Sequence, residues 1–231
     1  MSASTVEVRK RRRRWRTQLR KLRREVVDVL RCRQIYDRLR EIVEANPAIQ
    51  RPWTFHNWLI RNYTIATLVR VRRLVDQDGR TWSLVRLLEE IKRDPDLVSY
   101  RSHRAFYRKH YDRRDGTWLA RSAFKSVAGQ GGGALPRSVV EADLKKLRAG
   151  WQRLEVFTNK RVAHLDRQVP RGPAPKIREV NAAIDLVSET LRRYELLLLG
   201  SATGKGQEPV AQDDWDTVLT RAWIPRTRRA Q

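Results

Sequence analysis

Residues 176–199 read KIREVNAAIDLVSETLRRYELLLL, and this stretch decides the fold class. Its apolar residues recur at steps of three and four, as helical periodicity requires: Ile177, Val180, Ile184, Val187, Leu191, Tyr194 and Leu198. Gly200 is suited to end the helix, because glycine readily adopts the left-handed conformation of a helix C-cap. A helix with one apolar face needs partners to cover it, so the stretch predicts a helical core.

Helical periodicity also occurs earlier in the chain. It predicts a long helix over 15–45, a second helix over 54–75, and a short helix that follows Ser83 as N-cap and ends before Asp94. Residues 100–123 are polar, aromatic and basic, and we expect one or two weak helices there.

The longest apolar stripe runs from Val140 to Leu165 and includes Thr158. Ser138 is its expected N-cap, with Glu141 three residues later in a capping box. No stretch shows a convincing alternation of β-branched residues, and we find no internal repeat of the chain. The sequence therefore predicts an all-α fold, an antiparallel bundle of four to five helices.

Composition along the chain suggests three parts. We expect a basic arm over residues 1–16, a helical domain over 17–199, and a linker with a short, flexible C-terminal tail over 200–231. The glycine-rich segment 128–136 lies inside the helical domain, and we expect it to be a flexible loop. In the tail, residues 213–224 are expected to dock as a short amphipathic piece.

The chain is strongly basic. Its 231 residues include 50 Lys or Arg but only 26 Asp or Glu, for a net charge of +24. Such a charge favours polyanions, because each cation placed on a phosphate releases condensed counterions. The densest run supplies the candidate nucleic-acid contacts Arg11, Arg12, Arg13 and Arg14, which we expect in a solvated arm with non-specific affinity. The alternatives are a nuclear address, a specific nucleic-acid arm, or an Arg-rich composition without a function.

Cysteine and histidine are scarce. A single Cys and four His exclude a disulfide framework and a cysteine-based zinc site, and we expect neither a metal nor a cofactor. His103 and His110 are expected to be exposed on a basic helix. No window approaches about 18 consecutive apolar residues, so we expect a cytoplasmic protein without membrane association.

The most informative cluster lies near the end of the long stripe. On an α-helix, Lys160 and Arg161 would share a face with His164. Histidine titrates near neutral pH, and a guanidinium holds a phosphoryl group through two parallel hydrogen bonds. The spacing is therefore compatible with phosphate chemistry, although a basic helix with one His also arises by chance.

The surrounding sequence resembles a known family. Residues 159–166 read NKRVAHLD and resemble the signature of the HEPN superfamily, especially its abortive-infection Abi U type, with an Arg-Asn-Lys-x-x-Ala-His pattern. Residues 64–76 and 82–88 resemble the same branch, in which a helix ends in Arg-Leu-x-Asp and a Ser-Leu-x-x-Leu-Leu segment follows. The resemblance spans roughly residues 20–199.

The resemblance implies a helical homodimer in which the His-bearing helices of two protomers face each other. Active members resemble metal-independent ribonucleases, with a His acting on the RNA 2′-hydroxyl or the leaving oxygen and an Arg stabilising the charge at phosphorus. By position, His164 would be the acid/base residue and Asn159 the polar residue of the motif, with Lys160 holding RNA. RNA is the expected partner, together with an antitoxin or another protein.

The sequence departs from the family motif at one position. Thr158 stands where an Arg is expected, directly before Asn159. Arg161 is the candidate substitute, and Arg153 and Arg61 are alternatives. Two functions follow: an RNA-binding ribonuclease in a defence or toxin-like role, or a non-catalytic nucleic-acid or protein binding module on the same scaffold.

Overall fold

The computed structural model describes residues 5–51, 53–110, 113–163, 174–200 and 214–220. The α-helices in these residues are α1 (Thr5–Ala45), α2 (Trp53–Val75), α3 (Leu84–Arg93), α4 (Tyr100–His110), α5 (Arg113–Ala128), α6 (Arg137–Phe157) and α7 (Ile177–Leu199). Short 3-10 helices are η1 (Pro47–Ile49), η2 (Pro95–Leu97) and η4 (Trp215–Thr220), and η3 (Thr158–Ala163) is a π-helix. No strand occurs in the described ranges, and the predicted all-α class is confirmed.

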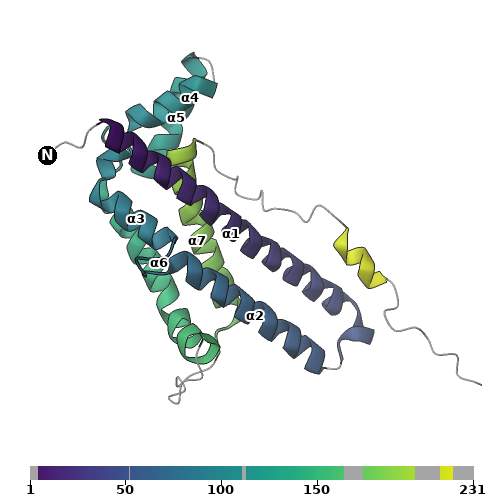
Figure 1. Ribbon diagram of the computed structural model, residues 1–231. Coiled ribbons are helices and arrows are strands. Elements are labelled where there is room, and N and C mark those ends of the chain that lie inside the picture. The colour runs from purple at the N-terminus through teal and green to yellow at the C-terminus, as the bar shows by residue number, and fades with distance from the viewer. Residues whose placement is uncertain (1–4, 52, 111–112, 164–173, 201–213, 221–231) are drawn as a thin grey trace, which may run out of the picture.

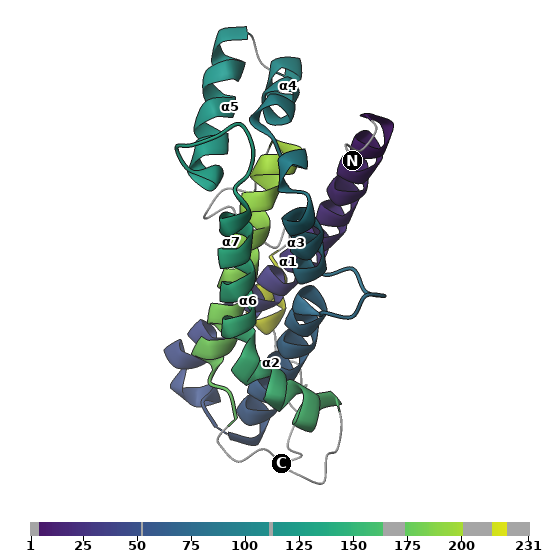
Figure 2. The ribbon, with the colours of Figure 1, turned by 90° about the vertical axis from the view of Figure 1, so that its left-hand side faces the viewer.

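Five long or central helices form the bundle. α1 packs on α2 and α7, α3 packs on α6, and α7 also contacts α2 and α6. α4 and α5 pair with each other as a hairpin that projects beyond the end of the bundle where α1 begins (Figures 1 and 2). The prediction of four to five bundled helices thus describes the core, to which the hairpin is added.

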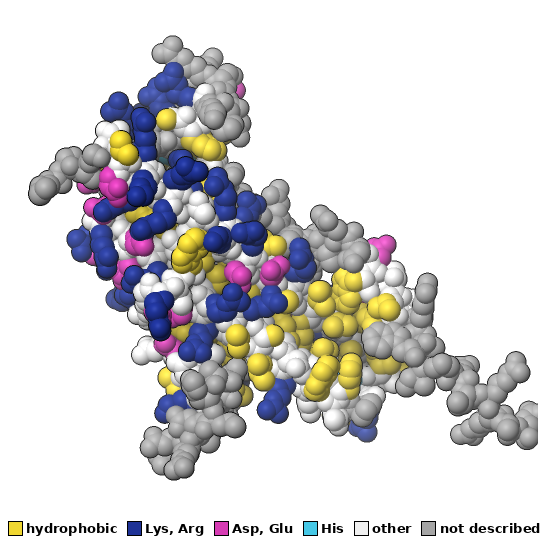
Figure 3. Space-filling view, in the orientation of Figure 1, with side chains coloured by type: hydrophobic (Ala, Val, Ile, Leu, Met, Phe, Trp, Pro, Cys, Tyr) yellow, Lys and Arg dark blue, Asp and Glu magenta, His cyan; other side chains and the backbone are white. Residues whose placement is uncertain are grey.

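The two ends of the molecule differ in surface chemistry. On the face shown in Figure 3, Lys and Arg gather over the first half of α1 and the α4–α5 hairpin. Apolar side chains gather at the opposite end, where α1 ends and α2 begins. On this face, the molecule therefore presents a cationic surface at one end and an apolar surface at the other.

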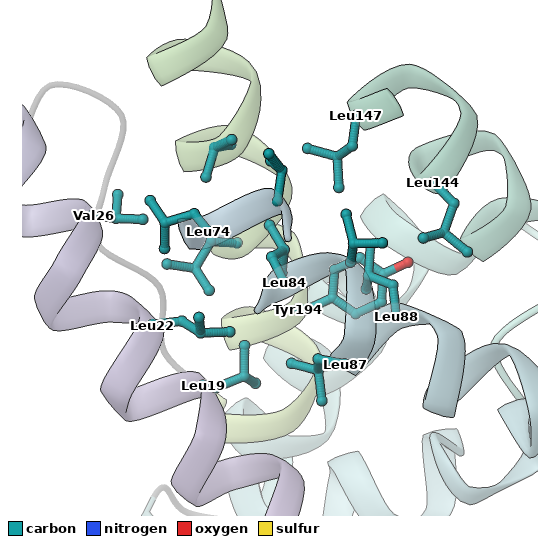
Figure 4. Close-up of a cluster of buried hydrophobic side chains, with 14 of the residues drawn as sticks. Leu19, Leu22, Val26, Leu74, Leu84, Leu87, Leu88, Leu144, Leu147 and Tyr194 are labelled. Carbon is teal, nitrogen blue, oxygen red and sulfur yellow. The ribbon is translucent and has the colours of Figure 1, made fainter. Parts of the chain in front are cut away.

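The core lies where α1, α2, α3, α6 and α7 meet (Figure 4). Leucines dominate it, and each fully buried one stabilises the fold by roughly 1.5–3 kcal/mol relative to its exposure to water. The labelled side chains are Leu19, Leu22, Val26, Leu74, Leu84, Leu87, Leu88, Leu144, Leu147 and Tyr194.

The basic run is part of a helix. α1 runs without interruption from Thr5, so the boundary expected at residue 16 falls in its interior. Trp15 is 1% exposed and donates a hydrogen bond of 2.9 Å from Nε1 to Glu90 of α3. The apolar face of α1 thus reaches into the arginine run, and residues 5–16 are a docked helix rather than a solvated arm.

Two local predictions near α6 are corrected. The helix starts at Arg137 with Pro136 as N-cap and no side-chain cap, so the expected capping box at Ser138 does not form. The glycine-rich loop is tied down at its end, since Leu135 donates its backbone N–H to Val98 at 2.9 Å and is 1% exposed. The contact between Leu135 and Val98 joins residues far apart in the chain, so the local sequence does not reveal it.

Other helix ends are as expected. The Ser83 hydroxyl caps α3 by accepting the Arg86 N–H at 3.1 Å. Gly200 ends α7 with a φ of 70°, and a Cβ there would lie 2.1 Å from the Phe106 ring of α4. Glycine is therefore required both for the conformation and for the close approach of α4.

The described part of the C-terminal region is η4. It lies beside α1, where Arg38 donates to Asp216 at 2.9 Å. The remainder of the expected linker and tail, residues 201–213 and 221–231, lies outside the described residues. Among the described helices, none combines the length and the apolar character needed to cross a membrane.

Candidate functional site

The family-like motif begins on an unusual turn. α6 ends at Phe157 and the chain continues as the π-helix η3, which packs against α2. A π-helix uses i→i+5 hydrogen bonds, so the α-helical spacing from which a shared face was predicted does not apply over 158–163. π-helical turns inside or at the end of α-helices occur frequently at functional sites.

Thr158 is part of the core. Its side chain is 0% exposed, and its hydroxyl donates a hydrogen bond of 2.7 Å to the carbonyl of Leu154, one turn earlier in α6. The residue at the position of the family arginine therefore points inward and is satisfied by the backbone. An arginine at this position would place its charge in the core.

Asn159 carries the one unexplained polar group of the motif in the described residues. The side chain is half-buried, and its Oδ1 atom is buried without a hydrogen-bond partner. Most buried polar groups in native proteins are hydrogen-bonded, and an unsatisfied one needs an explanation. Lys160, the next residue, is also half-buried. The side chain of Arg161 and all of His164 lie outside the described residues.

The two alternative arginines differ in their surroundings. Arg153 Nη1 forms an ion pair of 2.6 Å with Glu179 in the first turn of α7. Arg61 is exposed on α2, the helix that packs against η3. Arg153 would have to leave its carboxylate partner to reach a phosphate, whereas Arg61 has no ion pair with another described residue.

The expected nucleic-acid contacts of α1 are Arg11, Arg12, Arg13 and Arg14. They lie on two different faces of the helix. Arg11 pairs with Asp94 and Arg14 pairs with Glu90, on the side of α1 that faces α3. Arg12 and Arg13 lie instead along a groove beside α4. Arg9, Arg16 and Arg20 line the same groove and were not predicted, although their spacing of seven and four residues indicates a common face.

His103 is buried rather than exposed. It is 3% exposed, its Nδ1 lies 2.9 Å from the carbonyl of Leu197 in α7, and its ring packs against Tyr107 and Phe124. Burial lowers the pKa of His103, which favours the neutral ring. Within the described part of the chain, no three His, Cys, Asp or Glu side chains gather as metal ligands.

The apolar end of the molecule bears large exposed side chains. Trp53, Phe55 and Trp58 of α2 are 63%, 54% and 58% exposed. Trp53 lines a groove of about 530 Å³ between α1 and α2, together with Leu39, Val43 and Leu59 among others. The Phe55 and Trp58 rings stack on each other. Exposed apolar clusters of this kind mark interaction sites.

Comparison with protein families agrees with the motif. The family model HEPN_AbiU2, described as AbiU2, matches residues 14–220. The chain belongs to this HEPN family, whose abortive-infection class is the one that the motif resembles. The match extends beyond residue 199 and includes η4, so the C-terminal helix lies within the family region. Comparison with curated proteins and with solved structures finds no match.

Proposed function

We propose that the protein binds RNA and cleaves it without a metal ion, at a site formed by η3 and His164. The observation that carries this proposal is the buried, unpartnered Oδ1 of Asn159, on a π-helical turn within the family motif. Once the turn opens to expose this oxygen, it can accept a hydrogen bond from an RNA 2′-hydroxyl, a group that DNA lacks. The net charge of +24 supports a polyanionic ligand.

The chemistry needs one proton removed and one supplied. The 2′-hydroxyl loses its proton to a base and its oxygen attacks phosphorus, while the bond to the 5′-oxygen breaks and that oxygen gains a proton. The products are a 2′,3′-cyclic phosphate and a free 5′-hydroxyl. His164 suits either transfer, because imidazole titrates near neutral pH. Arg61 and Arg161 are the candidates for stabilising the charge on phosphorus.

A non-catalytic RNA-binding module is the second candidate, and the burial of Thr158 favours it. A threonine hydroxyl that donates to Leu154 cannot act as a guanidinium on the phosphorus oxygens. Loss of one such donor costs roughly 3 kcal/mol of transition-state stabilisation in other enzymes, or about a hundredfold in rate. Binding alone would survive this change.

The proposed catalytic state is a homodimer, as in the family that the motif resembles. The exposed Trp53, Phe55 and Trp58 provide an apolar surface suited to contact a second copy. The mass in solution tests this part of the proposal, with a dimer expected at twice the 27.3 kDa of the chain. A strict monomer would contradict a site composed of two His-bearing helices.

Incubation of purified protein with structured and single-stranded RNA in excess EDTA tests the function. Cleavage by the wild type that His164→Ala abolishes and Arg161→Ala reduces is the expected result. His110→Ala is the matched control, since it removes another histidine from outside the motif. Equal cleavage by the wild type and His164→Ala would contradict the site, and tight binding without cleavage would establish the non-catalytic module.

A further inference from the structure

A cationic groove lies between α1 and α4, far from the motif. Its volume is about 570 Å³, and among the residues that the structure describes no carboxylate lines it. The lining residues are Arg9, Arg12, Arg13, Arg16, Thr17 and Arg20 of α1 with Ser102 and Ala105 of α4. The small side chains of α4 leave room beside a row of guanidinium groups.

The fold holds two of these arginines in place. Arg12 donates from Nε to the carbonyl of Leu97 at 2.6 Å, and Arg16 donates from Nε to the carbonyl of Leu198 at 2.8 Å. These acceptors are uncharged, so they orient each guanidinium without neutralising it. Since a guanidinium carries five N–H donors, most of those of Arg12 and Arg16 remain for a ligand.

Within the described part of the chain, no carboxylate pairs with the groove arginines. The pKa of Arg12 is lowered by burial and by the neighbouring Arg16, and the pKa of Arg16 is lowered by burial and by Arg20. Arg11 and Arg14, on the other side of α1, are paired with carboxylates of α3. The repulsion within the groove therefore persists until an anion enters it.

We propose that this groove is a second RNA site, which binds the phosphate backbone independently of base sequence; the inference rests on the proposed RNA function. The guanidinium fork matches a phosphate bidentately. No aromatic side chain among the described residues lines the groove, so this part of the lining offers no base-stacking platform. The apolar face of α1, which begins at Trp15, is buried in the core, so this part of α1 presents no apolar face that could enter a membrane.

The groove and the motif lie at opposite ends of α7. Arg16 contacts Leu198 near its C-terminal end, and Arg153, five residues before the start of η3, contacts Glu179 near its N-terminal end. At 1.5 Å per residue, these two points of α7 are roughly 30 Å apart. The groove thus holds RNA at a distance from the site where cleavage is proposed.

The test compares two pairs of charge-removing substitutions. Arg13→Gln with Arg20→Gln removes two exposed groove charges, and Lys145→Gln with Lys146→Gln removes two exposed charges of α6. Gln has a helix propensity close to those of Arg and Lys, so all four substitutions preserve the helices. Fluorescence anisotropy with a labelled single-stranded RNA of about 20 nucleotides measures affinity across a salt series.

The groove pair is expected to weaken binding on the order of tenfold and to lower the salt slope by about 1.4, at about 0.7 per lost phosphate contact. The α6 pair is expected to leave the slope nearly unchanged. Equal effects of the two pairs would overturn the proposal that the groove binds RNA, but not RNA binding itself. Absence of binding by the wild type would overturn the proposed function as well. Displacement of the RNA by polyglutamate as effectively as by polyuridylate would contradict phosphate recognition.

Discussion

Thr158 donates a hydrogen bond of 2.7 Å to the carbonyl of Leu154, inside the core at the end of α6. The family motif has an arginine at this position. The chain thus combines membership of the HEPN AbiU2 family with a core residue at the position of the arginine in the motif that it resembles. Any catalytic arginine has to come from elsewhere.

Restoring the motif arginine should damage the fold. Thr158→Arg forces a long charged side chain into a fully buried position, so we expect a loss of at least about 3 kcal/mol in the free energy of unfolding. Thr158→Ser, which loses only a methyl group, should cost about 1 kcal/mol. Urea unfolding followed by circular dichroism measures both. A stable Thr158→Arg protein with higher ribonuclease activity would show that the side chain can reach the site.

The ionised Glu195 side chain should make the wild type less stable at neutral pH than a variant with a neutral side chain at this position. It is 2% exposed, and burial raises its pKa above the ordinary 4.5 despite Arg23, whose Nε lies 3.6 Å from it. The penalty for the ionised form is therefore present at neutral pH and is relieved as pH falls through the raised pKa. Glu195→Gln should unfold at a higher temperature than the wild type at pH 8, with the difference shrinking toward pH 4.5. A pH-independent difference would contradict this assignment.

His103 should have the opposite effect on the pH dependence of stability, since it destabilises the folded protein as pH falls. Because its pKa is lowered from 6.5 by burial, the unfolded state binds more protons between the folded pKa and 6.5. Its contribution to stability is present above pH 6.5 and is lost as pH falls. His103→Asn retains a donor for the Leu197 carbonyl, so its unfolding midpoint should change less than that of the wild type between pH 7.5 and pH 5.5. An equal change in both proteins would exclude His103 as the titrating group.

Ser83 should contribute measurably as an N-cap. Its hydroxyl accepts the Arg86 N–H and is fully buried at the start of α3, so Ser83→Ala should cost about 1 kcal/mol. Ser126→Ala is the control, because its exposed hydroxyl only donates to the carbonyl of Ala123 within α5. Thermal unfolding that shows the same loss for both variants would argue against a capping role.

Helices with local signals could be predicted from the sequence. The apolar spacing of α7, the Gly200 cap and the Ser83 cap depend on neighbours only a few residues away, and all three occur in the structure. The course of α1 through the arginine run could not be predicted. It depends on Glu90 and Asp94, more than 70 residues later, which pair with Arg14 and Arg11.

The candidate site was only partly predictable. The apolar stripe indicated that Thr158 shares the buried face of α6, as the structure confirms. The π-helical turn and the unpartnered Asn159 oxygen depend on packing against α2, and no residue pattern predicts them. The burial of His103 likewise requires α5 and α7, which supply Phe124 and the Leu197 carbonyl.

Mass spectrometry of RNA ends after incubation in EDTA tests the proposed function most directly. The wild type should produce fragments with 2′,3′-cyclic phosphate and 5′-hydroxyl ends, and His164→Ala should produce none. A 5′-phosphate end, or identical fragments from both proteins, would contradict cleavage by His164.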